Sequence, residues 1–142
     1  MSFTDLMLQR SSLFFSREEL DKIMNTTVAI AGLGGVGAIT AELLARWGIK
    51  KFRLLDKDKY EPTNLNRQLF ATSKTLGQYK VDVAAKRIRE INPYAEIEMI
   101  IKEPITNENG HRFLKDVDIL IQTTDSPSSL LFYKIAQRYK VP

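Results

Sequence analysis

The chain has no cysteine and a single histidine, His111, among its 142 residues. Without cysteine it can form no disulfide, no cysteine-ligated zinc site and no thiol nucleophile of its own. His111 stands in an Asn-Gly-His-Arg segment, which indicates a surface position. No apolar run approaches the roughly 18 residues of a membrane span, and the N-terminus lacks the basic-then-apolar pattern of a secretory signal. We therefore expect a soluble, cytoplasmic protein with no membrane partner.

Charge of one sign is not concentrated anywhere in the chain. The formal net charge is +4 and charged residues make up 27% of the sequence, but the lysines and arginines are scattered. This distribution does not favour nucleic-acid binding as the main role. The length suits one domain of about 100–150 residues, and the hydrophobic content of 44% is enough for a core.

Glycine is also scarce, yet four of the seven glycines stand within six positions. They are Gly32, Gly34, Gly35 and Gly37, in the order GxGGxG. The apolar run Val28–Ala31 before them predicts a buried strand. A helix is predicted after them from apolar residues at steps of three and four, namely Val36, Ile39, Leu43 and Trp47. Strand, glycine turn and helix form the context of a dinucleotide fingerprint, in which the turn approaches phosphate groups; a turn that only links the two elements is the alternative.

Strands and helices alternate through the rest of the sequence. Further strands are predicted at residues 52–55, 97–101 and 117–121, with 141–142 entering a fifth, and helices at 77–91, 106–114 and 128–140. This order indicates a Rossmann-like, doubly wound α/β fold, a mainly parallel sheet with helices on both faces. We expect residues 27–142 to form this nucleotide-binding domain.

Residues 1–26 are predicted to form an apolar N-terminal arm. Ser16 and Glu19 make a capping box for a short helix whose Leu20, Ile23 and Met24 face inward. We expect the arm to pack on its own domain or on a second subunit.

Acidic residues stand where two predicted strands end. Asp56 lies 19 residues past Gly37, where a dinucleotide fold places the acid that accepts hydrogen bonds from ribose hydroxyls. Asp58 is the weaker candidate, because it should already have left the strand. Asp125 follows the fourth strand, and ligands of such sheets bind beyond the carboxyl ends of the strands. We therefore expect Asp56, Asp125 and the glycine turn to meet.

Two cationic motifs follow the second strand, Asn64-Leu-Asn-Arg67-Gln68 and Gly77-Gln-Tyr-Lys80. Catalysis of phosphoryl or nucleotidyl transfer relies on positioning and on cations that stabilise charge on phosphate oxygens. Arg67 offers a forked donor and Lys80 a compact charge in a first helical turn. A solvated surface position is the alternative for both. An NAD- or FAD-binding Rossmann domain would need neither, and only the glycines and Asp56 favour it.

The combined order of GxGGxG, Asp, N-x-x-R-Q, G-x-x-K and T-x-D resembles the adenylating domain of the ubiquitin-activating superfamily, the ThiF/MoeB-like proteins. The likeness runs from about Leu20 to Pro142 and is strongest in DKDKYEPTNLNRQLFATSKTLGQYKVDVAAKRIREINP. It implies an ATP-dependent adenylyltransferase that uses Mg²⁺ and releases pyrophosphate. The implied substrate is the C-terminal carboxylate of a ubiquitin-like or sulfur-carrier protein ending in Gly-Gly, and the implied assembly is a homodimer.

The resemblance also implies a role for individual residues. Asp56 would hold the ribose, and Asn64, Arg67 and Gln68 would face the ATP. Lys80 would stabilise the α-phosphate during attack, and Asp125 would hold magnesium. Because the substrate carboxylate is already a nucleophile, the site needs cations and a metal rather than a general base. Arg10, with Arg17 as its competitor, would reach the phosphates from the arm of a second subunit.

The chain departs from the family pattern after Asp125. Relatives often continue with asparagine and then an arginine, whereas this chain has Ser126-Pro127 and later Leu130-Leu131. Members resembling the tRNA threonylcarbamoyladenosine dehydratases also carry Asp-Ser, so a carboxylate on tRNA is an alternative substrate. A non-catalytic scaffold is a third possibility, although such subunits usually lose Arg67 or Lys80. Family members continue well beyond this length, so we expect the N-terminal part of a longer fold.

Overall fold

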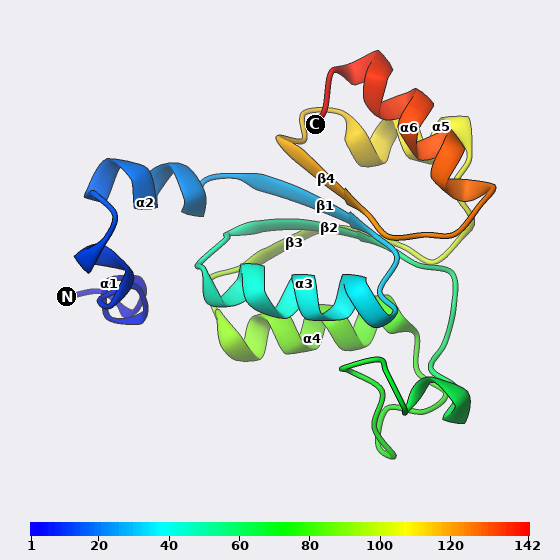
Figure 1. Ribbon diagram of the computed structural model, residues 1–142, viewed down its shortest axis with the longest axis horizontal. Helices are drawn as coiled ribbons and strands as arrows, with labels where there is room; N and C mark the ends of the chain where they lie inside the picture. The colour runs from blue at the N-terminus through cyan, green and yellow to red at the C-terminus, as the bar shows by residue number, and fades with distance from the viewer.

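A computed structural model describes residues 1–142, and its centre is one sheet of four parallel strands. The strands are β1 (Thr27–Ala31), β2 (Lys51–Leu55), β3 (Glu96–Ile101) and β4 (Ile119–Gln122). Their order across the sheet is β3-β2-β1-β4, so β1 and β2 are central (Figure 1). The four strands predicted up to residue 121 are confirmed within two residues, whereas residues 141–142 form no strand, although the Leu120 N–H donates to the Pro142 carbonyl oxygen at 2.8 Å.

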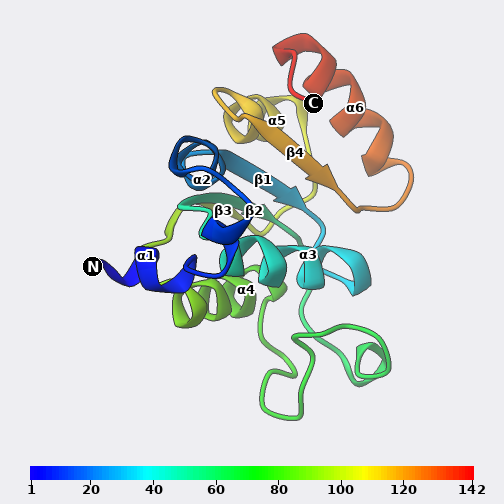
Figure 2. The same ribbon diagram turned by 60° about the vertical axis from the view of Figure 1, so that its left-hand side comes forward.

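Helices cover both faces of this sheet, as Figures 1 and 2 show. On one face lie α3 (Gly35–Arg46) and α4 (Lys80–Ile91), and on the other α5 (Asn107–Leu114) and α6 (Ser128–Tyr139). The predicted Rossmann-like α/β fold is therefore confirmed. No helix has both the length and the apolar character that crossing a bilayer requires.

The helix predicted at 77–91 begins three residues later than expected, at Lys80. Gly77 has a φ of +82°, and Tyr79 is extended with a ψ of 134°. Neither conformation continues a helix. Lys80 therefore occupies the first position of α4, so its side chain starts at the edge of the sheet where the strands end.

Two hydrophobic cores sandwich the sheet. Strand β1 is buried on both sides, with Val28 and Ile30 in the core beneath α3 and α4 and Ala29 and Ala31 in the core beneath α5 and α6. The last residue of β1 is thus held from both faces, and the glycine turn that follows starts from a fixed point.

Helix α3 turns its small residues toward the sheet and its large apolar residues toward solvent. The buried residues are Gly37, Ala38, Ala41, Glu42 and Ala45. The residues that predicted the helix stay exposed, namely Val36 at 65%, Ile39 at 47%, Leu43 at 53% and Trp47 at 37%. Close packing of α3 on β1 leaves room only for small side chains. The periodicity therefore identified the helix, while its large apolar face forms an open stripe.

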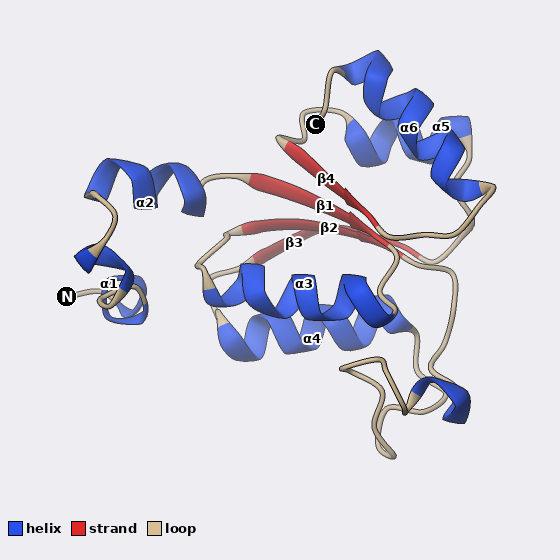
Figure 3. Cartoon of the chain, in the orientation of Figure 1, coloured by secondary structure: helices blue, strands red, loops and turns tan.

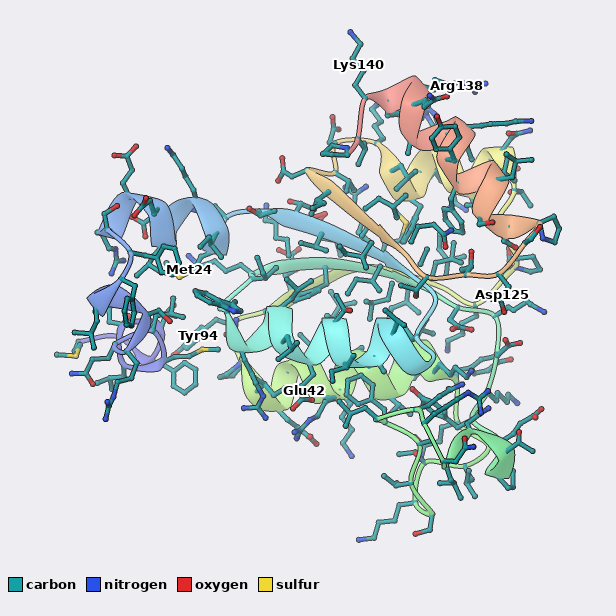
Figure 4. All side chains as sticks on the ribbon, viewed as in Figure 1. Met24, Glu42, Tyr94, Asp125, Arg138 and Lys140 are labelled. Atoms are coloured by element: carbon teal, nitrogen blue, oxygen red, sulfur yellow. The ribbon has the colours of Figure 1, made fainter.

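The N-terminal arm is folded and packs on one end of the domain (Figure 3). It consists of α1 (Phe3–Met7), the 3-10 helix η1 (Ser11–Leu13) and α2 (Arg17–Met24), and α2 carries the predicted capping box. Leu8 contacts Leu20 and Met24 in a small core of their own. The ring of Phe3 lies 5.9 Å from that of Tyr94, which Figure 4 labels beside the arm.

Candidate functional site

A cavity of about 600 Å³ opens at the edge of the sheet where the parallel strands end. The glycine turn, the exits of β2 and β4, the start of α4 and residues 103–105 enclose it, and Figure 4 labels Asp125 at this edge. Of the residues singled out in the sequence, those lining the cavity are Gly32, Gly34, Gly35, Asp56, Arg67, Gln68, Lys80 and Asp125. Gly37, Asn64 and Arg10 lie outside its lining.

The glycines of the turn have different physical roles. Gly32 has a φ of +88°, and a Cβ on Gly37 would lie 1.8 Å from the carbonyl oxygen of Gly32. These two glycines are therefore required by the backbone itself. A Cβ on Gly34 would be 3.4 Å from the nearest atom of Gln68, and one on Gly35 would be 3.8 Å from the nearest atom. Gly34 and Gly35 would therefore accept a Cβ at ordinary van der Waals distance, and both line the cavity.

Free backbone N–H groups face the cavity at the start of α3. The N–H groups of Gly34, Gly35 and Val36, which line the cavity, donate no hydrogen bond within the chain, and neither does that of Gly37, which lies outside the lining. Together with the positive end of the helix dipole, such groups form a site for an anion. A phosphate group matches this arrangement in charge and in hydrogen-bonding capacity.

Asp56 holds the turn in place and still faces the cavity. The side chain is 9% exposed; Oδ2 accepts the Leu33 N–H at 2.8 Å, and Oδ1 accepts the Asp58 N–H at 2.9 Å. Each carboxylate oxygen can accept a further hydrogen bond, so Asp56 can also bind ribose hydroxyls. Asp58 lines the cavity too, but it is exposed and its carboxylate lies 3.7 Å from Lys57.

Lys80 is a buried cation without an acidic partner. Only 7% of the residue is exposed, and its ammonium group forms no ion pair within the chain. The Nζ atom lies 5.5 Å from the centroid of the Tyr60 ring. The Lys80 side chain is thus held within the protein while its ammonium opens on the cavity, where an anion would be its only charged partner.

Arg67 and Gln68 come from the loop that follows the 3-10 helix η2 (Pro62–Asn64). Arg67 is exposed, and its Nη1 donates to the carbonyl oxygen of Thr63 at 3.0 Å and to Oδ1 of Asn66 at 2.9 Å. Its other donors are free for a ligand. Gln68 is 7% exposed, and its Oε1 is buried with no hydrogen-bond donor.

Asn64 stabilises the loop through hydrogen bonds and does not line the cavity. It is 8% exposed, and its Oδ1 accepts the Glu61 N–H at 2.9 Å. The N–H groups of Arg67 and Gln68 both donate to the Asn64 carbonyl oxygen, at 3.2 and 3.0 Å. Asn64 therefore fixes the turn from which Arg67 and Gln68 extend.

Asp125 is exposed at the rim of the cavity. The structure contains no group of three or more histidine, aspartate or glutamate side chains that could hold a metal. Magnesium commonly binds through one or two carboxylates together with phosphate oxygens and water. Asp125 fits this mode as a single protein ligand, in which a bound nucleotide would complete the coordination.

The arm places Arg10 and Arg17 away from this cavity. Arg10 is exposed between α1 and α2. Arg17 pairs with Asp5 at 2.5 Å and with Asp21 at 3.0 Å, and its hydrogen bond holds the pKa of Asp5 below the ordinary value. Arg17 is therefore engaged within the arm, whereas the Arg10 side chain has no such partner.

Sequence reasoning missed two residues that shape the site. The Oγ1 of Thr123 donates to the carbonyl oxygens of Ala31 at 3.0 Å and Gly32 at 2.8 Å, which ties the exit of β4 to the glycine turn. The hydroxyl of Tyr60 donates to the Leu33 carbonyl oxygen at 3.2 Å. A threonine two residues before Asp125 is a visible signal, but its partners lie 91 and 92 positions away.

Comparison with known proteins places this geometry in a family. The sequence profile of the ThiF family matches residues 8–142. The chain is 41% identical over 127 residues to the tRNA threonylcarbamoyladenosine dehydratase of Bacillus subtilis (strain 168), covering 89% of this chain and 48% of that protein. It is 40% identical over 112 residues to ubiquitin-like modifier-activating enzyme 5 of Drosophila ananassae, covering 79% and 27%. The chain thus spans less than half the length of these relatives.

Solved structures show the same likeness. The E. coli tRNA N6-threonylcarbamoyladenosine dehydratase TcdA in complex with ATP superposes with a TM-score of 0.91 at 28% identity, covering 97% of this chain and 57% of that chain. E. coli MccB with ATP gives a TM-score of 0.76 at 29% identity, covering 87% and 37%. On the match over residues 8–142, this chain belongs to the ThiF family.

Proposed function

We propose that this chain is the ATP-binding adenylation domain of an enzyme that activates a carboxylate as an acyl-adenylate and releases pyrophosphate. One observation carries the proposal: the unpaired ammonium of the largely buried Lys80 and the free N–H groups at the start of α3 belong to the same cavity wall. Both need an anion, and a polyphosphate can satisfy them together.

In this mechanism the substrate carboxylate attacks the α-phosphorus, one P–O bond forms, and the bond to pyrophosphate breaks. A carboxylate is ionised at neutral pH, so no base has to remove a proton. Negative charge grows on the phosphate oxygens, and Lys80 and Arg67 are two of the cationic residues that line the cavity. Asp56 would hold the ribose, and Gln68, which lines the same cavity, would face the nucleotide.

The charges around the cavity support a nucleotide bound with a divalent cation. Three cationic residues line it, Lys57, Arg67 and Lys80, against four acidic ones, Asp56, Asp58, Glu103 and Asp125. A polyphosphate alone would add negative charge to a wall that already has more acids than bases. Magnesium held by Asp125 would offset this charge and polarise the phosphate oxygens.

ATP is a better candidate than NAD or FAD. A dinucleotide does not need cations aimed at a terminal phosphate, whereas Lys80 is buried at this cavity without a protein partner. The similar TcdA and MccB structures contain ATP. Calorimetric titration of ATP and NAD in the presence of Mg²⁺ tests the choice, and tighter binding of NAD would refute it.

The substrate is proposed to be the C-terminal carboxylate of a ubiquitin-like or sulfur-carrier protein ending in Gly-Gly, since ubiquitin-like modifier-activating enzyme 5 is among the relatives. A carboxylate on tRNA is the second candidate, because the identity to the B. subtilis dehydratase is 41% and Ser126 follows Asp125. AMP formation measured with a Gly-Gly-ending protein and with tRNA separates the two. The candidate that stimulates AMP formation is the substrate whose carboxylate the enzyme activates.

We further propose that the chain forms a homodimer through the open stripe of α3 and the adjoining arm. Leu13 and Phe14 are 72% and 84% exposed, and Leu43 on α3 is 53% exposed. Arg10 lies on the same arm and could reach the nucleotide site of the second subunit. Sedimentation at micromolar concentration measures the assembly, and a monomer under these conditions would refute this proposal.

Two lysines of α4 provide a matched test of the nucleotide site. Lys80→Ala removes the ammonium at the cavity wall, whereas Lys86→Ala removes that of an exposed residue on the same helix. We expect Lys80→Ala to weaken ATP binding by about tenfold or more, the scale of a lost charge-assisted hydrogen bond, and to abolish ATP–pyrophosphate exchange. Lys86→Ala should bind ATP as the wild type does. Equal binding by both variants would remove the proposed mechanism.

A further inference from the structure

Tyr60 is the largest side chain that is fully buried, and the proposed reaction assigns it no chemical role. It lies between the two phosphate-binding elements, the glycine turn and the start of α4. Its hydroxyl donates to the Leu33 carbonyl oxygen at 3.2 Å, and the Nζ of Lys80 lies 5.5 Å from its ring centroid. Its own backbone is held by Gln78 and Gly77, at 3.0 and 2.9 Å.

The Tyr60 ring holds the Lys80 ammonium without neutralising its charge. An acidic partner would hold the ammonium in place but would also neutralise it and compete with a phosphate. The face of an aromatic ring attracts a cation within about 6 Å without removing its charge. Lys80 is thus steadied at the cavity wall while its full positive charge stays available.

The hydroxyl of Tyr60 acts on the glycine turn at the same time. Leu33 is held on both backbone polar groups, because its N–H donates to Asp56 at 2.8 Å and its carbonyl oxygen accepts from Tyr60. The next residues, Gly34 and Gly35, carry N–H groups that have no partner in the chain. Burial and the negative charge of Asp56 raise the pKa of Tyr60, so the phenol remains a neutral donor.

We propose that Tyr60 is a positioning residue for the nucleotide phosphates: its ring steadies the charged ammonium of Lys80 and its hydroxyl fixes the glycine turn. This inference rests on the proposed ATP site and adds a residue to it. If Tyr60 only filled the core, replacing it would weaken binding of the nucleoside and of the phosphates alike. If it positions the phosphate-binding groups, replacing it weakens binding of the phosphates selectively.

The experiment compares the dissociation constants of ATP and adenosine for the full chain with Mg²⁺ present. For Tyr60→Leu, which removes the ring, we expect ATP to bind about 5–30-fold more weakly, the range of a desolvated cation–π contact, and adenosine to change less than about twofold. Tyr60→Phe keeps the ring and should recover most of the loss, with about 2–5-fold weaker ATP binding from the missing hydrogen bond.

Two controls connect the effect to Lys80. In a Lys80→Ala background, Tyr60→Leu should weaken ATP binding only by the about 2–5-fold that the missing hydroxyl explains, because the ring has no ammonium left to hold. Tyr79 carries Lys59 and Lys102 over its ring, each at 4.7 Å, and lies outside the cavity lining. Tyr79→Leu should therefore leave the ratio of the ATP and adenosine constants unchanged.

The outcomes separate this inference from the proposed function. If the wild type does not bind ATP, both fail. The positioning role is overturned, and the ATP site stands, if the wild type binds ATP but Tyr60→Leu weakens the binding of ATP and adenosine equally. The same holds if Tyr60→Leu weakens the binding of neither. If Tyr60→Leu does not fold, Tyr60→Phe decides: a selective loss of ATP affinity supports the role, and an unchanged ratio overturns it.

Discussion

The ion pair between Glu42 of α3 and Arg87 of α4 is the most informative place to perturb the fold. The Glu42 side chain is 11% exposed, and Arg87 approaches it with two donors, Nε to Oε2 at 2.8 Å and Nη2 to Oε1 at 2.9 Å. Figure 4 labels Glu42 on α3 beside α4. Glu42 stands seven residues after the first residue of α3, and Arg87 seven after the first residue of α4.

This spacing gives the pair a positional consequence. At about 1.5 Å per residue, the pair lies about 10.5 Å along each helix from the helix starts that are proposed to bind phosphate. The pair therefore fixes the axial register of α3 relative to α4, and with it the position of Lys80 relative to the glycine turn.

Arg87→Gln should lower the free energy of unfolding by about 2 kcal/mol. Breaking a fully buried ion pair costs about 3–5 kcal/mol. The cost is smaller for this pair because the Arg87 side chain is 40% exposed to solvent. Arg46 is the matched control, because it donates to the same carboxylate at 2.7 Å from within α3 and is 54% exposed. Arg46→Gln should cost only about 0.3–0.5 kcal/mol, the usual value for an i,i+4 helix pair.

Urea unfolding followed by circular dichroism measures both variants, and its pH dependence checks the cause. The hydrogen bond from Arg87 is the largest cause that lowers the pKa of Glu42 below 4.5. The pair therefore stabilises the fold above about pH 4.5, and its contribution is lost as the pH falls through the lowered pKa. The difference between wild type and Arg87→Gln should shrink below pH 4. Equal costs for the two arginines, or a cost that does not depend on pH, would refute the reasoning.

Three further predictions concern the glycine turn, Thr123 and the open stripe of α3. Gly37→Ala should prevent folding, because its Cβ would lie 1.8 Å from the Gly32 carbonyl oxygen. Gly35→Ala should fold but bind ATP more weakly. Thermal unfolding measures the folding of both variants, and calorimetry measures their ATP binding. Thr123→Val removes the hydrogen bonds from Oγ1 and should lower the unfolding free energy by about 1–2 kcal/mol, and an unchanged melting temperature would contradict this. Leu43→Glu should leave the melting temperature nearly unchanged and convert a dimer to a monomer in sedimentation.

Much of this molecule follows from local patterns in its sequence. Hydrophobic periodicity and glycine positions predicted all four strands and the helices of the domain, because element type depends on neighbouring residues. Polar residues at the ends of strands, such as Asp56 and Asp125, were expected to meet because a parallel sheet gathers those ends at one edge. Both residues line the cavity.

The tertiary structure decided what depends on contacts between distant segments. Hydrophobic periodicity does not show which face of α3 packs on the sheet. The small residues pack there because the turn at Gly37 brings the helix close to the strand. The absence of an acidic partner for Lys80, and the ring of Tyr60 near its ammonium, depend on how the segment between β2 and α4 folds back on itself. Local sequence thus determined the elements and the chemistry available, while packing determined which groups stay free for a ligand.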